Sequence, residues 1–196
     1  MLATIAKAFS VPEIRRKLLF VAAMLAIYRL GAYIPAPGVD VDAVKDLESQ
    51  LTGSNILGFL NLFSGGSLSR LSLFALGIMP YITASIILQL MTVVVPSLER
   101  LQKEGETGQQ KITQYTRYLT VALAFAQSFA YVFLFNSLAA GGVSPIGDLT
   151  FPKVSLIVIC LTAGTVLLMW IGELITQRGI GNGISLIIFA GIVAGL

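Results

Sequence analysis

Residues 71–95 form a run of 25 residues that contains no charged side chain. A helix of this length spans a hydrocarbon core about 30 Å thick with some tilt. A second apolar stretch, 56–63, lies just upstream, and the turn sequence Ser-Gly-Gly-Ser joins the two. Because the upstream stretch is too short to cross a bilayer, the pair predicts a short re-entrant segment that feeds a full span, as in the lining of a pore.

The composition of the whole chain indicates a polytopic membrane protein. Its 196 residues are 56% hydrophobic and 12% charged, whereas a soluble domain carries about 25% charged residues. The net charge of +3 is too small and too scattered to indicate a nucleic-acid partner. The absence of histidine and the single cysteine, Cys160, exclude an intrachain disulfide and a His or Cys metal site. We interpret Cys160 as a packing residue.

The sequence predicts five transmembrane helices. Four are complete, at about 18–35, 71–95, 115–137 and 154–173, and a fifth begins near Ile184 and is still apolar at Leu196. This last stretch covers only about 20 Å as a helix, so we expect the natural chain to continue. The basic patch before the first span is not followed by a small-residue cleavage site, and we therefore expect a retained span rather than a signal peptide.

Basic residues predict the orientation of these spans, because cytoplasmic loops carry an excess of Lys and Arg. One side collects nine of them, namely Lys7, Arg15, Arg16, Lys17, Arg100, Lys103, Lys111, Arg117 and Arg178. The other side has only Lys45, Arg70 and Lys153, among several acidic residues. We therefore place the N terminus, loop 96–114 and turn 174–183 in the cytoplasm, and segments 36–70 and 138–153 outside.

The predicted spans hold few ionisable side chains. They contain no Asp or Lys, and Glu173 lies at a span edge, so we predict no catalytic residues and find little that could couple ions. Arg29, in the outer part of the first span, either extends to the outer interface or binds a partner inside the bundle. Gln127 either forms a hydrogen bond across a helix interface or has a functional role.

An uncharged interior can still control passage through a narrow apolar constriction, which excludes ions by dewetting. Ile78 and Ile82 are one helical turn apart and share a face, and Pro80 between them permits a kink or a break. Composition alone favours a lipid-facing or core position for both isoleucines, with a constriction as the alternative.

Five stretches resemble, in the same order, the SecY family of central subunits of bacterial protein-conducting channels. They are 29–39 (RLGAYIPAPGV), 63–70 (FSGGSLSR), 72–90 (SLFALGIMPYITASIILQL), 103–118 (KEGETGQQKITQYTRY) and 170–189 (WIGELITQRGIGNGISLIIF). The resemblance covers essentially the whole chain. It implies an all-α polytopic fold in which ten helices form two inverted halves around a pore. Residues 1–196 match the first half, with five transmembrane helices and a short re-entrant half-helix.

The resemblance also implies roles for particular residues. Residues 55–71 match the plug, which seals the external side at rest, with Asn55, Ile56, Leu57, Phe59, Leu60, Phe63, Gly65, Gly66, Leu68 and Arg70 as its candidates. The pore ring matches Ile78, Ile82 and Ile188, which reverses the interpretation from composition. One wall of a lateral gate, through which signal sequences reach lipid, matches Ile86, Ile87, Leu90 and Gln127.

The implied function is passive conduction of unfolded secretory polypeptides across the bacterial plasma membrane, with lateral release of transmembrane segments into the lipid bilayer. The implied partners are the SecE and SecG subunits, the SecA motor ATPase, the ribosome and substrate chains that carry signal sequences; no cofactor is implied. The residues themselves leave two alternatives. One is half of a secondary small-solute transporter, which needs a polar cage at mid-membrane. The other is a scaffold or insertase without a through-pore.

Two glycine motifs carry less information. The sequence GIGNG at 179–183 lacks the G-x-G-x-x-G spacing and follows no strand, so we predict a tight turn with a helix start at Asn182 or Ser185. Gly191 and Gly195 have the spacing that permits close helix packing.

Overall fold

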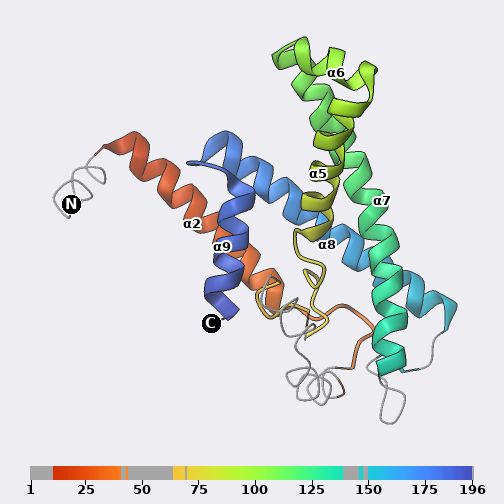
Figure 1. Cartoon of the computed structure of the whole chain (residues 1–196). Helices are drawn as coiled ribbons and strands as arrows, with labels where there is room; N and C mark the ends of the chain where they lie inside the picture. Colours follow the sequence, from red (N-terminus) through yellow and green to blue (C-terminus); the bar gives the residue numbers. More distant parts are fainter. Residues whose placement is uncertain are drawn as a thin grey trace.

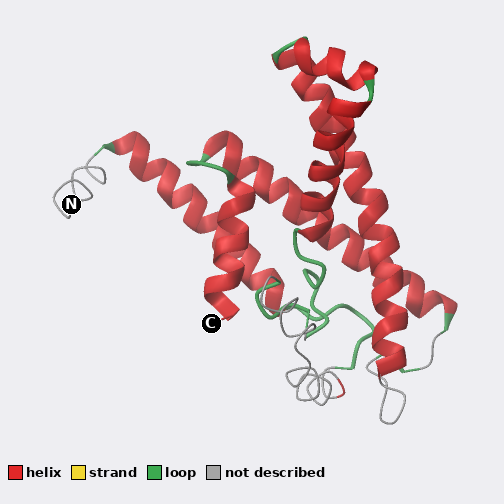
Figure 2. Cartoon of the chain, viewed as in Figure 1, coloured by secondary structure: helices red, strands yellow, loops and turns green. Residues whose placement is uncertain are grey.

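The computed structural model of the chain describes residues 11–40, 43, 64–68, 70–138, 146–147 and 150–195. Within these ranges the regular structure is helical, and the β-type pairing is a single antiparallel bridge between Pro35 and Ser72. Figures 1 and 2 show the helices, which are α2 (Pro12–Tyr33), α5 (Met79–Val94), α6 (Pro96–Lys103), α7 (Glu106–Leu138), α8 (Phe151–Arg178) and α9 (Gly183–Gly195). The predicted all-α architecture is confirmed for the described part of the chain.

Helix α8 is at the centre of the helix packing. It packs against α7 and also against α2 and α9, while α5 and α6 pack against α7. In Figure 1, α2 and α9 lie by the C-terminal part of α8, whereas α7, with α5 beside it, crosses the N-terminal part of α8. Helices α7 and α8 run antiparallel, since Arg117 bonds to Glu173 and Ser128 bonds to Thr162.

Two of the described helices, α7 and α8, are long and apolar enough to cross a membrane on their own. Helices α5 and α6 reach this length together, but the chain bends by 99° between them. Helix α2 is not in this group because Arg29 adds a charge to those of its first two turns. Helix α9 is apolar and shorter than a full span. The described helices thus supply two spans, or three with the bent pair.

The second predicted span is not a continuous helix, and this part of the prediction is wrong. Residues 71–78, which we name the buried link, form successive turns, and α5 begins only at Met79. Leu71 and Gly77 have φ angles of +43° and +59°, which a right-handed helix cannot contain. Pro80 lies in the first turn of α5, where its missing N–H costs nothing, so it starts this helix instead of kinking it.

The backbone of the buried link has partners outside any helix. The amide of Ala36 donates to the Leu71 carbonyl oxygen, and the amide of Leu73 donates to that of Ile34, both at 2.9 Å. Irregular backbone at membrane depth is tolerated only where protein surrounds it. The buried link meets this condition, because all its side chains except that of Leu73 are buried.

The sequence predicts a cytoplasmic loop at residues 96–114, and the prediction of a loop is wrong because these residues are mostly helical. Helix α6 occupies its first part, and α7 already begins at Glu106, so a two-residue turn at Glu104 and Gly105 is all that separates them. Gly105 takes a φ of +75°, which suits a residue without Cβ at a helix end. The family-like motif 103–118 therefore lies mainly on helix.

The turn between α8 and α9 is shorter than predicted, because α8 continues to Arg178. The Asn182 side-chain oxygen accepts hydrogen bonds from the amides of Ile184 and Ser185 at 3.0 and 3.5 Å. This is the geometry of an N-cap, so the predicted helix start at Asn182 is confirmed. The span predicted to begin near Ile184 is α9, which begins one residue earlier.

Two apolar clusters form the core, and the buried link contributes to both. The first cluster joins Leu71, Ala75 and Leu76 to side chains of α7 and of the first half of α8. The second cluster joins Phe74 and Ile78 to side chains of α2, the second half of α8 and α9. Different residues of one non-helical segment therefore pack in both clusters and connect the two halves of the helix assembly.

Candidate functional site

The three candidate pore isoleucines belong to the second core cluster. Ile78 is 5% exposed, and Ile82 and Ile188 are half-buried hydrophobic residues packed against the same cluster. The amide of Ile82 donates to the Ile78 carbonyl oxygen at 3.1 Å, so both side chains lie on one face of α5, as predicted. Residues more than 100 positions apart in sequence thus lie in one apolar cluster.

A glycine on α8 makes room for this cluster. A Cβ atom at Gly172 would lie 3.3 to 3.7 Å from side-chain atoms of Ile184, Ile187 and Ile78. Gly183 approaches the same turn of α8 so closely that a Cβ there would collide with the Gly172 carbonyl oxygen. Because α8 and α9 approach so closely here, Ile188 on α9 packs in the same apolar cluster as Ile78.

The candidate gate residues on α5 face away from the core. Ile86, Ile87 and Leu90 are 51%, 38% and 64% exposed, whereas Ala84 and Thr92 on the opposite side of α5 are buried. The exposed isoleucines and leucine therefore lie on an exposed face of α5, a helix that contains no charged residue. Gln127 is half-buried on α7. Its neighbour Ser128 makes the cross-helix hydrogen bond, to Thr162 at 3.2 Å.

The plug candidates divide into two groups. Asn55, Ile56, Leu57, Phe59, Leu60 and Phe63 lie outside the described residues. Residues 64–68, which we name the glycine turn, are described and form turns, so the predicted half-helix does not extend through them. Gly65 and Gly66 have φ angles of +63° and +81°, as suits two glycines at a hinge. Leu68 is 3% exposed and packs in the first core cluster, while Arg70 is exposed.

Arg29 binds inside the bundle, and this decides between its two predicted interpretations. Its guanidinium donates to the carbonyl oxygen of Gly65 at 3.1 Å and to that of Ala194 at 3.2 Å. The same group lies over the ring of Tyr33, 5.2 Å from the centroid, and Arg70 lies over this ring at 4.7 Å. Arg29 therefore connects α2, the glycine turn and α9.

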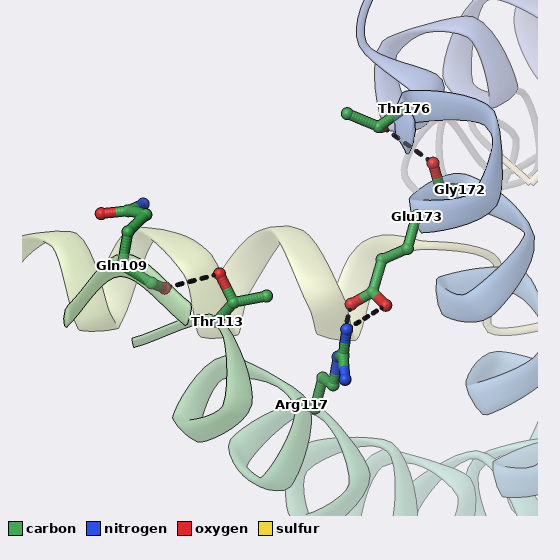
Figure 3. Close-up of polar contacts among 6 residues, drawn as sticks. All are labelled: Gln109, Thr113, Arg117, Gly172, Glu173 and Thr176. Carbon is green, nitrogen blue, oxygen red and sulfur yellow. Dashed lines mark hydrogen bonds and ion pairs between the residues drawn. The ribbon is translucent and has the colours of Figure 1, made fainter. Parts of the chain in front are cut away.

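A bidentate ion pair joins the N-terminal part of α7 to the C-terminal part of α8. Arg117 on α7 binds both carboxylate oxygens of Glu173 on α8, at 2.7 and 2.8 Å (Figure 3). The Glu173 side chain is 12% exposed, so it is largely shielded from water. On the next turn of α8, the Thr176 hydroxyl donates to the Gly172 carbonyl oxygen and accepts from the Gly183 amide, both at 2.9 Å. The ion pair and these two hydrogen bonds together hold α7, α8 and the start of α9 in position relative to one another.

Among the described residues, no group of three or more His, Cys, Asp or Glu side chains is arranged to hold a metal ion. The polar groups named above bind one another or the backbone. This arrangement is suited to fixing the helices against one another.

The family model described as SecY matches residues 72–196 of this chain. The chain belongs to the SecY family. The protein translocase subunit SecY of Streptomyces galbus is 52% identical over an alignment of 200 residues, which covers 99% of this chain and 46% of that protein. The same subunit of Escherichia coli K12 is 52% identical over 184 residues, covering 94% of this chain and 41% of that protein. The chain thus spans about half the length of the SecY relatives it matches.

Solved structures agree with membership of the SecY family at the level of fold. A structure described as a protein-conducting channel covers 96% of this chain, with a TM-score of 0.63 and 21% identity. Sec61 in the canine ribosome–channel complex of the endoplasmic reticulum gives the same TM-score, identity and coverage of this chain. In each case the match takes in about two fifths of the solved chain, at 40% and 41%.

Sequence reasoning about this SecY-family chain missed the Arg117–Glu173 pair. Both residues lie within stretches that resemble the family, and both lie near the ends of predicted spans. A signal was present, because an acid and a base on consecutive spans often pair. The sequence alone does not give the rotation of each helix, however, and so the pairing could not be specified.

Proposed function

We propose that the chain is the N-terminal half of the pore-forming subunit of a protein translocase. This subunit passes unfolded secretory polypeptides across the membrane and releases transmembrane segments laterally into lipid. The observation that carries the proposal is the 52% identity to SecY over nearly the whole chain. The gathering of Ile78, Ile82 and Ile188 in one apolar cluster supports it.

In this proposal residues 1–196 supply five transmembrane segments of a ten-helix channel with two inverted halves. The segments are α2, the buried link with α5, α7, α8, and α9 with the chain that follows it. Residues 55–71 are the plug, and the glycine turn is its C-terminal hinge. Burial of the link between two core clusters supports its assignment to the protein interior instead of a lipid-facing helix.

The pore ring works through its lack of polar atoms. Side chains of Ile78, Ile82 and Ile188 close around an extended chain and exclude ions, because an apolar constriction resists wetting. They form no hydrogen bonds with the passing polypeptide, so the chain moves without specific holding points. The half-buried positions of Ile82 and Ile188 are consistent with side chains that face a path completed by the other half.

The lateral gate has one wall on α5 and α7, with Ile86, Ile87, Leu90 and Gln127. An exposed apolar face without charges can pack against protein when closed and against lipid when open. The mixture of apolar residues with one amide suits a contact that must separate without leaving a buried charge.

The channel has no catalytic residues of its own, and a motor ATPase or the ribosome drives it. We propose SecE and SecG as its partner subunits, SecA as its motor, and signal-bearing secretory and membrane proteins as its substrates. Its location is the bacterial plasma membrane, with the N terminus cytoplasmic. The excess of basic residues at the N terminus, in α6 and at the end of α8 supports this orientation.

Site-directed crosslinking tests the proposal in the full-length chain with its partner subunits. Cys160 is replaced by alanine, and single cysteines are placed at Ile78, Ile82 or Ile188. A second set of single cysteines is placed at Ile86, Ile87 or Gln127, with exposed Phe129 on α7 as the control. A stalled secretory polypeptide with one cysteine should crosslink at the three isoleucines of the pore ring and not at the control.

Other crosslinking patterns lead to other conclusions. Crosslinks at Ile86, Ile87 or Gln127 alone would indicate lateral insertion without a through-pore. The absence of crosslinks at every position would favour the small-solute transporter.

A further inference from the structure

Arg29 joins the glycine turn to two helices that are distant in sequence. We propose that Arg29 is a positioning residue that holds the glycine turn in the sealed position of the channel and so sets the threshold for opening. The carrying observation is the pair of hydrogen bonds from its guanidinium to the carbonyl oxygens of Gly65 and Ala194. This inference rests on the proposed function, because it assigns regulation to the same pore.

The chemistry of arginine suits this task. A guanidinium keeps its charge in any protein environment, and a charge at membrane depth needs acceptors. Its planar fork of five N–H donors reaches two carbonyl oxygens that approach from different elements, which the compact ammonium of lysine does less well. Because each carbonyl oxygen has two lone pairs, Ala194 can accept from Arg29 while it takes part in a helix.

The glycine turn fits closely between the two helices that Arg29 connects. A Cβ atom at Gly65 would lie 3.1 Å from the Gly191 Cα atom on α9 and 3.1 Å from the Tyr28 hydroxyl on α2. Gly191, one half of the predicted packing motif, therefore contacts the glycine turn. Arg29 bonds across the same gap, so its contact and the steric fit define one position of the turn.

A second arginine opposes this contact. Arg29 and Arg70 lie over the same Tyr33 ring, with guanidinium carbons 5.2 and 4.7 Å from its centroid. The ring attracts each cation, but the two like charges repel each other. Arg70 lies between the glycine turn and the buried link, so a displacement of Arg70 with the turn would relieve the repulsion. The hydrogen bond from Arg29 to Gly65 counteracts this repulsion and, together with the burial of Leu68 in the first core cluster, keeps the turn in place.

The test uses the full-length complex with Arg29→Gln and Arg29→Lys. Loss of one charge-assisted hydrogen bond shifts a two-state equilibrium by roughly tenfold. Arg29→Gln should therefore raise the open fraction of the idle channel by about this factor, as measured by ion conductance without substrate. Export of a reporter with a disabled signal sequence should rise with it. Arg29→Lys should give a smaller increase, because lysine keeps the charge but not the fork.

A matched control and an independent variant separate this role from general damage. Arg15→Gln removes a positive charge from an exposed position of the same helix and should leave idle conductance unchanged. Gly65→Ala disturbs the turn directly and should raise idle conductance. In the double variant the increase should be smaller than the product of the two single increases, since both changes act on one contact.

Each outcome supports or overturns the inference. A fold defect lowers the amount of complex and the export of normal substrates, so increased conductance with normal export identifies a lost positioning contact. Idle conductance of Arg29→Gln equal to that of wild type, or an increase that simply multiplies with that of Gly65→Ala, would overturn the inference. If the Arg29→Gln complex cannot be purified, the Arg29→Lys and Gly65→Ala variants test the inference instead. Idle conductance equal to that of wild type in both variants would refute the inference. A wild-type complex that exports no signal-bearing substrate would refute the proposed function instead.

Discussion

Two arginines hold this molecule together in different ways. Arg117 binds the carboxylate of Glu173, so two opposite charges meet between α7 and α8. Arg29 binds backbone carbonyl oxygens, which are neutral, between α2, the glycine turn and α9. Separating the first pair strands a largely buried carboxylate, whereas separating the second leaves neutral carbonyl oxygens and a guanidinium that still contacts the Tyr33 ring and hydroxyl. The first contact therefore suits a permanent joint, and the second suits one that opens and closes.

We expect the largest effect when the permanent joint, the Arg117–Glu173 ion pair, is broken. Arg117→Met leaves Glu173 without its partner and should lower the free energy of unfolding by about 2–4 kcal/mol, near the lower end for buried pairs because Arg117 is partly exposed. Detergent-induced unfolding of the purified full-length complex measures this loss. The double variant Arg117→Met, Glu173→Met should recover most of it. A double variant as unstable as the single one would assign the loss to packing and not to the stranded charge.

The contact between α8 and the buried link should be the next most sensitive. A Cβ at Gly164 would collide with the backbone carbonyl oxygen of Leu73, which a flexible side chain cannot relieve. We expect Gly164→Ala to cost about 1–3 kcal/mol, as for other overpacked cores. Its matched control is Ala163→Val, which adds atoms at the exposed neighbouring position and should change stability little. Equal stability of both variants would show that the link shifts freely.

A third prediction concerns the contact that opens and closes, between Arg29 and the glycine turn. It tests the Tyr33 ring, over which both Arg29 and Arg70 lie. Tyr33→Leu takes away both cation–π contacts and should favour opening by about 0.5–1 kcal/mol, a change of a few-fold in idle conductance. Tyr33→Phe keeps the ring and should behave like wild type. The Tyr33 hydroxyl also accepts a hydrogen bond from Arg29 at 3.4 Å. If Tyr33→Phe opens the channel as much as Tyr33→Leu, this hydrogen bond matters and the ring does not.

The smallest expected effect concerns an uncharged bond in the permanent region. Ser128→Ala removes the hydrogen bond to Thr162 and should cost about 0.6 kcal/mol, the average for such bonds between membrane helices. A double-mutant cycle with Thr162→Val isolates the pairwise energy in the same unfolding assay. A coupling energy near that of the Arg117–Glu173 pair would remove the distinction between charged and uncharged contacts across α7 and α8.

Sequence reasoning succeeded where one helix explains a whole apolar run. Helices α7, α8 and α9 were predicted in the right order and near their observed positions, and the N-cap at Asn182 was predicted from its residue type. It failed at residues 71–78, because an apolar run has the same composition whether lipid or protein surrounds it. The positive φ of Leu71 has no sequence signal, since leucine rarely adopts this conformation.

The candidate site was predictable only in part for a related reason. Hydropathy identified Arg29 as exceptional, but its acceptors are backbone carbonyl oxygens, which every residue carries and no sequence pattern marks. The assignments of Ile78, Ile82 and Ile188 to a pore ring came from family resemblance, and their place in one cluster depends on tertiary packing that a sequence does not display. These assignments and those of the gate residues stay predictions.

The right-angled bend after α5 has a mechanical consequence. Helix α6 leaves α5 at 99° and packs against α7, so the three helices are braced at one end (Figure 1). Such a braced frame tilts as one body. Helix α7 is about 50 Å long at 1.5 Å per residue, so a 5° tilt about its far end would displace α6 by about 4 Å. A spectroscopic probe on α6 would therefore detect a tilt of α7 that produces only a small displacement near the far end of that helix.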